Sequence, residues 1–249
     1  MRPLSAQRVT DLRVLNNRLT GYANVADETG LFRPRPVLAV AEDVANQGDT
    51  TVCGTAPKPP CPYYIYYPDR ITITGNTIIQ HVQHSPGIGL DSVDDLTLAD
   101  NSISHTHRFA PAGQLNPNNH RPTSIELSFG VPLGSSGYFL NERTLLNWWS
   151  INANRLSQFA DGIRIQQKKA SVSVSAAEVN RNVFNTAQSL PQGILLLNAQ
   201  SAGQSGFIHN FTVDGNQFGC GFGGLARNAY VRPSGQGHMG NVGERLACP

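Results

Sequence analysis

Charge is scarce in this chain. Asp, Glu, Lys and Arg together make up 14% of its 249 residues, well below the usual quarter. The net charge is +2, and no run of basic residues alternates with aromatic residues. This composition gives no general attraction to nucleic acid or to a membrane surface. The chain also lacks an apolar stretch long enough to cross a bilayer. We therefore expect neither nucleic acid nor a membrane as a partner.

Cysteine is equally sparse, with four residues and no C-x-x-C spacing, which disfavours a zinc or redox site. Cys53 with Cys61 and Cys220 with Cys248 form two local pairs, although four cysteines allow three pairings. Disulfides would indicate an oxidising compartment, so we expect a secreted or cell-surface protein. Residues 1–12 lack the apolar core of a signal peptide. A removed signal, a fragment of a longer chain and a cytoplasmic protein all stay open.

An eight-residue pattern is present six times: apolar, any, apolar, any, any, Asn, any, apolar. Two apolar positions two apart predict a short strand with one buried face. The Asn predicts a turn, because its side chain tolerates a left-handed backbone and bonds nearby peptide groups. The six positions are Asn17, Asn76, Asn101, Asn154, Asn182 and Asn216. A unit this short cannot bury its apolar face alone, so the copies must stack into a solenoid.

A second motif, small-Ile-any-apolar, recurs between the Asn motifs and gives each coil a second strand. It occupies residues 87–90, 124–127, 162–165 and 193–196. Asn side chains at equivalent turns of successive coils should then stack into a hydrogen-bonded ladder.

These two alternating motifs, over about residues 8–222, resemble the right-handed parallel β-helix of the pectin-lyase-like superfamily. The resemblance implies an all-β solenoid of about six to eight coils with long loop insertions. Residues 1–222 would form the helix, and the Gly-rich tail 223–249 would pack on it or cap it. The motifs are specific for this architecture and not for one family within it.

Long insertions interrupt the repeat at regular places. Residues 22–36 and 104–123 precede a second-motif strand, whereas residues 41–69 and 128–148 follow one. The insertions therefore flank one sheet on both edges. Long loops on a rigid scaffold commonly carry function, so we expect the second-motif sheet to form the floor of a walled groove.

Strand alternation predicts which side chains face this groove. The two outward columns are Gly89, Glu126, Arg164, Leu195 and Asp91, Ser128, Gln166, Leu197. Asp91 and Glu126 should have backbone positions roughly 8 Å apart. That range includes the ~6.5–9.5 Å separation of the carboxyl groups in an inverting glycosidase. The alternative is an exposed Glu126–Arg164 ion pair of little energetic value.

Five of the seven histidines lie between residues 81 and 120. His84, His105 and His107 follow Asn motifs of adjacent coils, so we expect them on one edge of the groove. Histidine is the natural general base near neutral pH, and His105-x-His107 also suits a metal. Surface histidines in loops are the alternative interpretation.

Other side chains are candidates for binding a substrate or a cation. The substrate-binding candidates are Tyr64, Tyr66, Arg108, Gln166 and Lys168, since tyrosine stacks on sugar rings and cations neutralise a polyanion. Calcium would take Asp91, Asp94 and Asp95, although turns often carry Asp for structural reasons. Covering of the core by the tyrosines and simple solvation of the charges are the alternatives.

The sequence therefore predicts a carbohydrate-active β-helix that cleaves a polysaccharide, acidic in character, as a lyase or a glycoside hydrolase. Arg164 would clamp a carboxylate, a His would act as base, and Glu126 with Asp91 would act as acid and base or hold calcium. No cofactor is required for hydrolysis. The alternative is a non-catalytic glycan-binding, adhesive or structural module of phage-tail or cell-surface type. A tailspike-like role would predict a trimer.

Overall fold

Three parallel sheets form the body of the protein in the computed structural model. The model describes residues 4–6, 9–21, 36–48, 50–82, 85–106, 122–132, 137–187, 191–199, 207–222, 229–233 and 235–246. Apart from a single 3₁₀ turn, η1 (Cys220–Phe222), the regular structure in these residues consists of strands. Within them no helix has the length and apolar character needed to cross a membrane.

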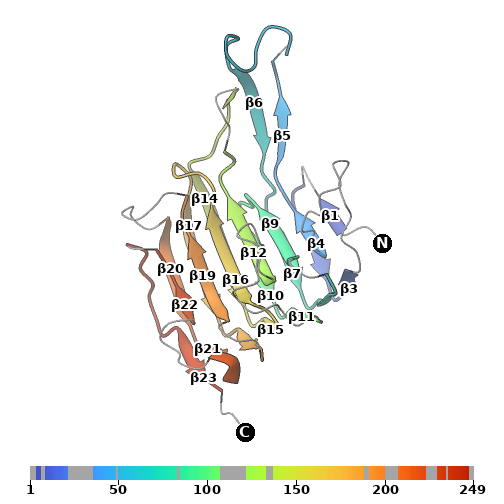
Figure 1. The fold of residues 1–249 in the computed structure, drawn as a ribbon, viewed down its shortest axis with the longest axis vertical. Helices are drawn as coiled ribbons and strands as arrows, with labels where there is room; N and C mark the ends of the chain where they lie inside the picture. Colours follow the sequence, from blue (N-terminus) through green and yellow to red (C-terminus); the bar gives the residue numbers. More distant parts are fainter. Residues whose placement is uncertain are drawn as a thin grey trace, which may run out of the picture.

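Each sheet contains strands that are far apart in the sequence and pair in parallel (Figure 1). The first sheet has the order β1 (Leu4–Ala6), β4 (Leu38–Val40), β9 (Ile88–Asp91), β12 (Thr123–Phe129), β16 (Asp161–Gln167), β19 (Gln192–Leu197) and β22 (Tyr230–Val231). The second has the order β2 (Arg13–Leu15), β7 (Ile71–Thr74), β10 (Leu96–Ala99), β14 (Leu145–Asn152), β17 (Ser173–Asn180) and β20 (Ile208–Asp214). The third is ordered β3 (Arg18–Gly21), β8 (Thr77–Gln80), β11 (Ser102–His105), β15 (Arg155–Ser157), β18 (Val183–Asn185), β21 (Asn216–Phe218) and β23 (Gly243–Arg245).

The chain visits the three sheets in turn. Strands β7, β8 and β9 are followed by β10, β11 and β12, and each later strand pairs with its equivalent one turn earlier. The predicted all-β architecture of stacked parallel strands is confirmed, and the arrangement is consistent with a parallel β-solenoid. Within the Gly-rich tail, β22 extends the first sheet and β23 extends the third.

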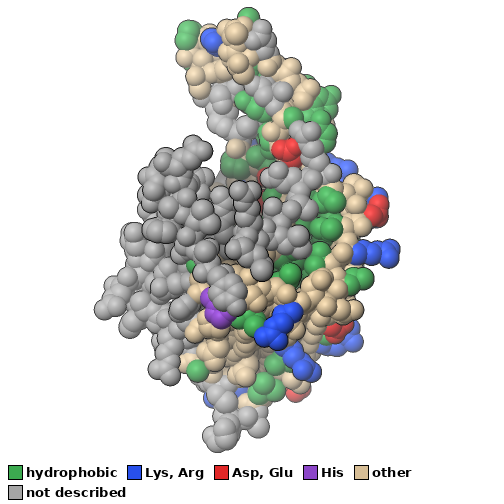
Figure 2. Space-filling view, turned by 90° about the vertical axis from the view of Figure 1, so that its right-hand side faces the viewer, with side chains coloured by type: hydrophobic (Ala, Val, Ile, Leu, Met, Phe, Trp, Pro, Cys, Tyr) green, Lys and Arg blue, Asp and Glu red, His purple; other side chains and the backbone are tan. Residues whose placement is uncertain are grey.

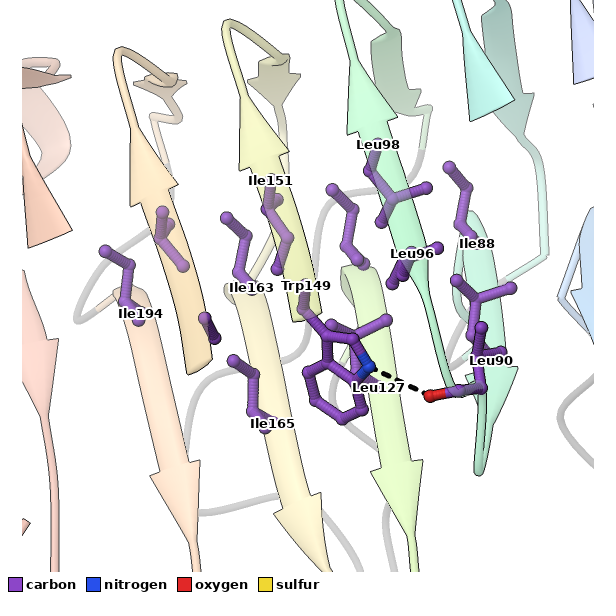
Figure 3. Packing of buried hydrophobic residues seen from close by; sticks show 14 of the residues in the cluster. Ile88, Leu90, Leu96, Leu98, Leu127, Trp149, Ile151, Ile163, Ile165 and Ile194 are labelled. Atoms are coloured by element: carbon purple, nitrogen blue, oxygen red, sulfur yellow. Dashed lines mark hydrogen bonds between the residues drawn. The ribbon is translucent and has the colours of Figure 1, made fainter. Parts of the chain in front are cut away.

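The apolar motif positions fill the space between the sheets (Figure 3). Side chains of the first sheet, such as Ile163, meet side chains of the second, such as Ile151, and both are fully buried. Trp149 is buried as well, and its indole N–H donates to the carbonyl of Val93 at 2.9 Å. Because equivalent residues stack in register from coil to coil, the core is one continuous column of apolar side chains.

The predicted Asn ladder is confirmed at all six positions. Each Nδ2 from Asn17 to Asn182 donates to Oδ1 of the next Asn, at 3.0–3.2 Å, and each Oδ1 beyond the first also accepts the backbone N–H of the preceding Asn. From Asn76 onward each Nδ2 also donates to a backbone carbonyl of the preceding coil, as Asn101 does to Ile73 at 2.8 Å. The five ladder residues from Asn76 onward are buried.

The left-handed residue of each turn is not the ladder Asn, as the sequence suggested, but the residue before it. Positive φ values of 55–70° occur at Asn16, Gly75, Asp100, Ala153, Arg181 and Gly215. The left-handed residue bends the chain from a strand of the second sheet into a strand of the third. The Asn that follows is then free to turn its amide into the ladder.

A small additional sheet projects beyond the coils. Strands β5 (Asp43–Asn46) and β6 (Cys61–Tyr66) are antiparallel, and β13 (Gly137–Phe139) runs parallel to β6. This projecting sheet, visible at the top of Figure 1, is built from the insertions 41–69 and 128–148. A disulfide joins Cys53 to Cys61, which is one of the pairings that the sequence left open. The other predicted pair, Cys220 with Cys248, includes a residue outside the described part of the chain.

Candidate functional site

The outward columns of the first sheet have the predicted register. Glu126 is paired with Gly89 on one side and with Arg164 on the other, and Ser128 stands between Asp91 and Gln166. No ion pair joins Glu126 to Arg164 within these described strands. The Nε atom of Arg164 is buried and has no hydrogen-bond partner among the described residues. Gly89, Asp91, Glu126 and Ser128 of these columns line one cavity, whereas the column residues on β16 and β19 do not.

This cavity has a volume of about 260 Å³. Its polar lining comes from Asp91, Glu126, Ser128 and Lys168. The apolar lining includes Pro36, Val40, Ala41, Pro86 and Leu90. An apolar cavity with a few converging polar groups is the usual form of a small-ligand site.

Gly89 explains how one wall can lie so close to the floor. A Cβ atom at this position would stand 2.6 Å from Cγ of Pro36, closer than real Cβ contacts come. The absence of a side chain at residue 89 thus lets Pro36 rest directly on β9. The site beside Glu126 is enclosed from that side.

Three charged groups gather where the first-sheet strands end. Asp91 ends β9 and forms an ion pair with Lys168, which follows β16. Glu42 lies between β4 and β5 at the same edge. Burial, and then repulsion by Asp91, raise the pKa of Glu42 to about 7, although Lys168 and a hydrogen bond from Ser92 act in the opposite direction. Two carboxyl groups therefore share one corner, and at pH 7 about half of the Glu42 side chains hold a proton.

One carboxyl oxygen of Glu42 has no hydrogen-bond partner. This atom, Oε2, is buried, and no described residue bonds to it. A buried polar atom left unpaired costs free energy, so Glu42 Oε2, like Nε of Arg164, is a group whose lack of a partner calls for an explanation.

The segment that follows β13 is held in place by several contacts. Arg143 donates its backbone N–H to the Tyr67 hydroxyl at 3.0 Å, and its guanidinium lies 5.2 Å from the centre of the Tyr67 ring. Glu142 forms an ion pair with Lys169 at 2.6 Å. Burial raises the pKa of Tyr67, which keeps its hydroxyl protonated. The segment is thus fixed beside the end of the first sheet.

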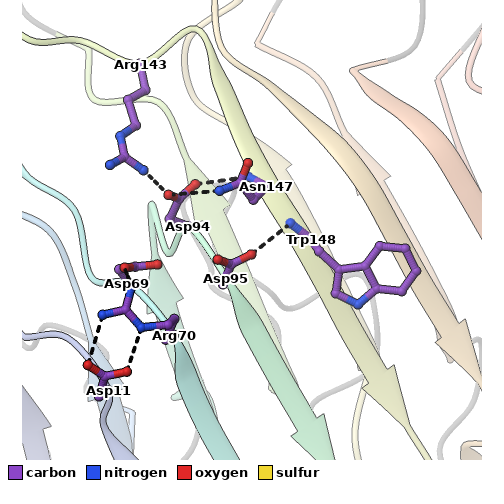
Figure 4. Close-up of polar contacts among 8 residues, drawn as sticks. All are labelled: Asp11, Asp69, Arg70, Asp94, Asp95, Arg143, Asn147 and Trp148. Atoms are coloured by element: carbon purple, nitrogen blue, oxygen red, sulfur yellow. Dashed lines mark hydrogen bonds and ion pairs between the residues drawn. The ribbon is translucent and has the colours of Figure 1, made fainter.

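Asp94 and Asp95 accept hydrogen bonds from the end of the same segment and from the start of β14, so their role is structural (Figure 4). The buried carboxylate of Asp94 accepts hydrogen bonds from Arg143 and from the backbone and side chain of Asn147. Asp95 accepts the backbone N–H of Trp148 at 3.4 Å. Neither joins Asp91, and the described residues contain no cluster of three His, Cys, Asp or Glu that could hold a metal. The predicted calcium site gains no support from this arrangement.

The candidate histidines do not gather at the groove in the described structure. His105 is only 3% exposed and follows the inward alternation of Ile103, so its ring lies in the interior. His81 contacts the Thr106 hydroxyl at 2.9 Å. His84 and His107, like the candidate Arg108, lie outside the described residues.

The candidate tyrosines do not line the first-sheet cavity. Phe139 and Tyr63 are in edge contact on one face of the projecting sheet, and Lys169, which follows the first-sheet strand β16, lies 5.5 Å from the Phe139 ring. Tyr64 and Tyr66 alternate to the opposite face.

Sequence reasoning missed Glu42. The available signal was its place at the first residues of insertion 41–69, directly after a predicted strand of the groove floor.

No family model, no curated protein and no solved structure matches this chain.

Proposed function

We propose that this protein is a secreted, right-handed parallel β-helix of the pectin-lyase-like kind that hydrolyses a polysaccharide at the first-sheet cavity. Asp91 and Glu126 are the two catalytic carboxyl groups. The observation that carries the proposal is that both line one cavity from neighbouring strands, two residues apart in register. Strand geometry separates their backbones by roughly 8 Å. This spacing suits a pair that leaves room for a water molecule.

In this mechanism Asp91 is the base and Glu126 the acid. Asp91, which forms an ion pair with Lys168, takes a proton from water as the water oxygen attacks the anomeric carbon. Glu126 gives its proton to the departing glycosidic oxygen as the carbon–oxygen bond breaks. Glu42 is a positioning residue, because its proton beside Asp91 sets the charge of this corner.

The charge of the site favours a neutral glycan over the acidic one expected from sequence. The cavity lining carries two carboxyl groups and one lysine, and that lysine is already paired with Asp91. A uronic acid would meet net negative charge there. β-Elimination needs a cation for the substrate carboxylate, so the same balance favours hydrolysis over lyase chemistry.

The disulfide supports the extracellular part of the proposal. Cys53 and Cys61 close a short loop in the projecting sheet. Such bonds form and persist mainly in oxidising compartments.

The test is a panel of neutral and uronate polysaccharides, with release of reducing ends and of unsaturated products followed separately. We expect reducing ends from a neutral glycan, and a loss of about 10²–10⁴-fold in kcat for Asp91→Asn and Glu126→Gln. Glu178→Gln is the matched control, because Glu178 is bonded to Ser150 on the outer face of the second sheet. Binding without turnover would favour the glycan-binding module instead. Equal activity in all three variants would refute the assignment.

A further inference from the structure

One face of the projecting sheet carries several large, exposed side chains. Residue pairing places Tyr138 beside Pro62, Tyr64 beside Ala45, and Tyr66 beside Asp43 on that face. The backbone N–H of Leu140 donates to the carbonyl of Tyr63, which continues the β13–β6 pairing and aligns Leu140 with Tyr64. We call Tyr64, Tyr66, Tyr138 and Leu140 the tyrosine face.

These four side chains are unusually exposed for their size. Their exposed fractions are 38% for Tyr64, 39% for Tyr66, 50% for Tyr138 and 49% for Leu140. On the opposite face Ile65 is only 2% exposed. Figure 2 shows hydrophobic side chains along the projection, above a body that carries several Lys and Arg. Large apolar side chains gathered on one exposed face indicate an interaction site.

A second cavity continues from the tyrosine face. It has a volume of about 260 Å³ and is lined by Thr10, Ile65, Tyr66, Tyr67, Asn141 and Arg143. Asn141 fixes its shape, because its amide accepts the Ile65 N–H at 2.9 Å and donates to the Ile65 carbonyl at 2.8 Å. The Arg143 side chain remains 47% exposed there, although one of its N–H groups reaches Asp94.

We propose that the tyrosine face is a second glycan-binding site, in which one sugar occupies the Arg143 cavity and the chain continues over Tyr64 and Tyr138. Aromatic rings offer flat apolar surfaces to the C–H faces of pyranose rings, and tyrosine hydroxyls bond sugar hydroxyls. The guanidinium of Arg143 has five N–H donors, more than Asp94 uses. The cavity would therefore orient the bound sugar chain through hydrogen bonds, and the tyrosine rings would supply the contact area.

The size of the face argues for a sugar chain rather than a protein. A standard protein interface takes about 20–30 residues from each side. The tyrosine face has four large side chains on short strands, and three of them end in hydroxyl groups. A narrow aromatic strip with polar tips matches a single glycan chain.

This site is separate from the catalytic cavity, because the two cavities share no lining residue. The proposal rests on the proposed function only for the class of ligand. A glycan held here would keep the protein on an insoluble or long substrate, while the first-sheet cavity acts on chain ends or short segments that reach it.

The test is affinity electrophoresis in gels that contain xylan, galactomannan or hydroxyethyl cellulose. The variants are Tyr64→Ser with Tyr138→Ser, and the matched control is Leu15→Ser, an exposed apolar residue on β2 with 46% exposure. We expect at least one polysaccharide to retard the wild-type chain. The paired tyrosine variant should then bind about 10–30-fold more weakly, as two stacking contacts of roughly 1 kcal/mol each require. Hydrolysis of short oligosaccharides should change by less than about twofold.

Two results would overturn the proposal. One is the absence of retardation in all three gels, or retardation that the tyrosine substitutions leave unchanged. The other is a wild-type dimer in sedimentation that the same substitutions dissociate, because the face would then bind a second copy. Neither result depends on whether Asp91→Asn affects hydrolysis, so the two proposals fail separately.

Discussion

Buried polar groups have a full set of hydrogen bonds at one edge of the coils and an incomplete set at another. At the Asn turns every copy bonds the next, and the buried amides from Asn76 onward find partners for both oxygen and nitrogen. At the end of the first sheet Glu42 is largely buried, yet one of its oxygens has no partner. The ladder Asn residues are satisfied by their own copies, whereas Glu42 lies in an insertion and has no copy to pair with.

The substitution with the largest expected effect removes one residue of the Asn ladder. Asn101→Ala removes the acceptor for two donors of Asn76 and the donor to Ile73 and Asn154. Because the groups left behind are buried, we expect a loss of about 3–5 kcal/mol in the free energy of unfolding. Denaturant titration would measure it.

The end of the ladder supplies the control. Asn17 is exposed and bonds only one neighbouring rung. Asn17→Ala should cost about 1 kcal/mol, close to the net value of an ordinary hydrogen bond. Equal costs at the two positions would show that the ladder does not gain from being continuous.

The next test concerns the unsatisfied edge. Glu42 has its pKa raised to about 7 from 4.5, chiefly by burial. The folded state thus binds this proton more tightly than the unfolded chain. The contribution to stability is complete below pH ~4.5 and is lost as the pH rises toward 7. Glu42→Gln should flatten this dependence and gain about 2 kcal/mol relative to the wild type between pH 5 and pH 8.

Unfolding free energies of the wild type and of Glu42→Gln, measured at pH 5 and pH 8, test this prediction. Glu178→Gln serves as the control, because its carboxylate is bonded by Ser150 and Asn152. An identical pH slope for wild type and Glu42→Gln would mean that Glu42 is not held in the protonated form.

The smallest test returns to the turns. Ala153 has a φ of 56°, a conformation that costs a residue with a Cβ about 1–2 kcal/mol. Ala153→Gly should stabilise the protein by about 0.5–1 kcal/mol after the extra entropy of glycine is subtracted. Thermal unfolding would detect the change.

Gly75 is the reverse case at the equivalent position. Its φ is 70°, and an added Cβ would lie 2.2 Å from Oδ1 of Asn16. Gly75→Ala should therefore destabilise the fold. The same sign for both substitutions would contradict the assignment of these positions to left-handed residues.

The repeat made the first-sheet floor predictable from sequence. Counting along the motifs placed Glu126 beside Arg164 and Asp91 beside Ser128, and the strand register is the same. This works because alternation has a fixed period, so a position relative to the Asn determines which face a side chain occupies.

Residues outside the repeat could not be placed in this way. Glu42 lies in an insertion, where no motif position exists to count from. Tyr64 owes its orientation to pairing with Ala45 within the insertion, which the sequence does not reveal. His105 differs, because the alternation after Ile103 already implied an inward ring.

The strand β23 carries a further consequence. Its register aligns Gly243 with Asn216, at the place where a seventh rung would stand. The last amide instead donates to the carbonyl of Val242 at 3.1 Å, and a Cβ on Gly243 would lie 2.0 Å from the Asn216 carbonyl oxygen. All the amides of the ladder point in one direction along the stack. The ladder is thus a polar column with two different ends, and the position of Gly243 is where the column of side-chain amides stops.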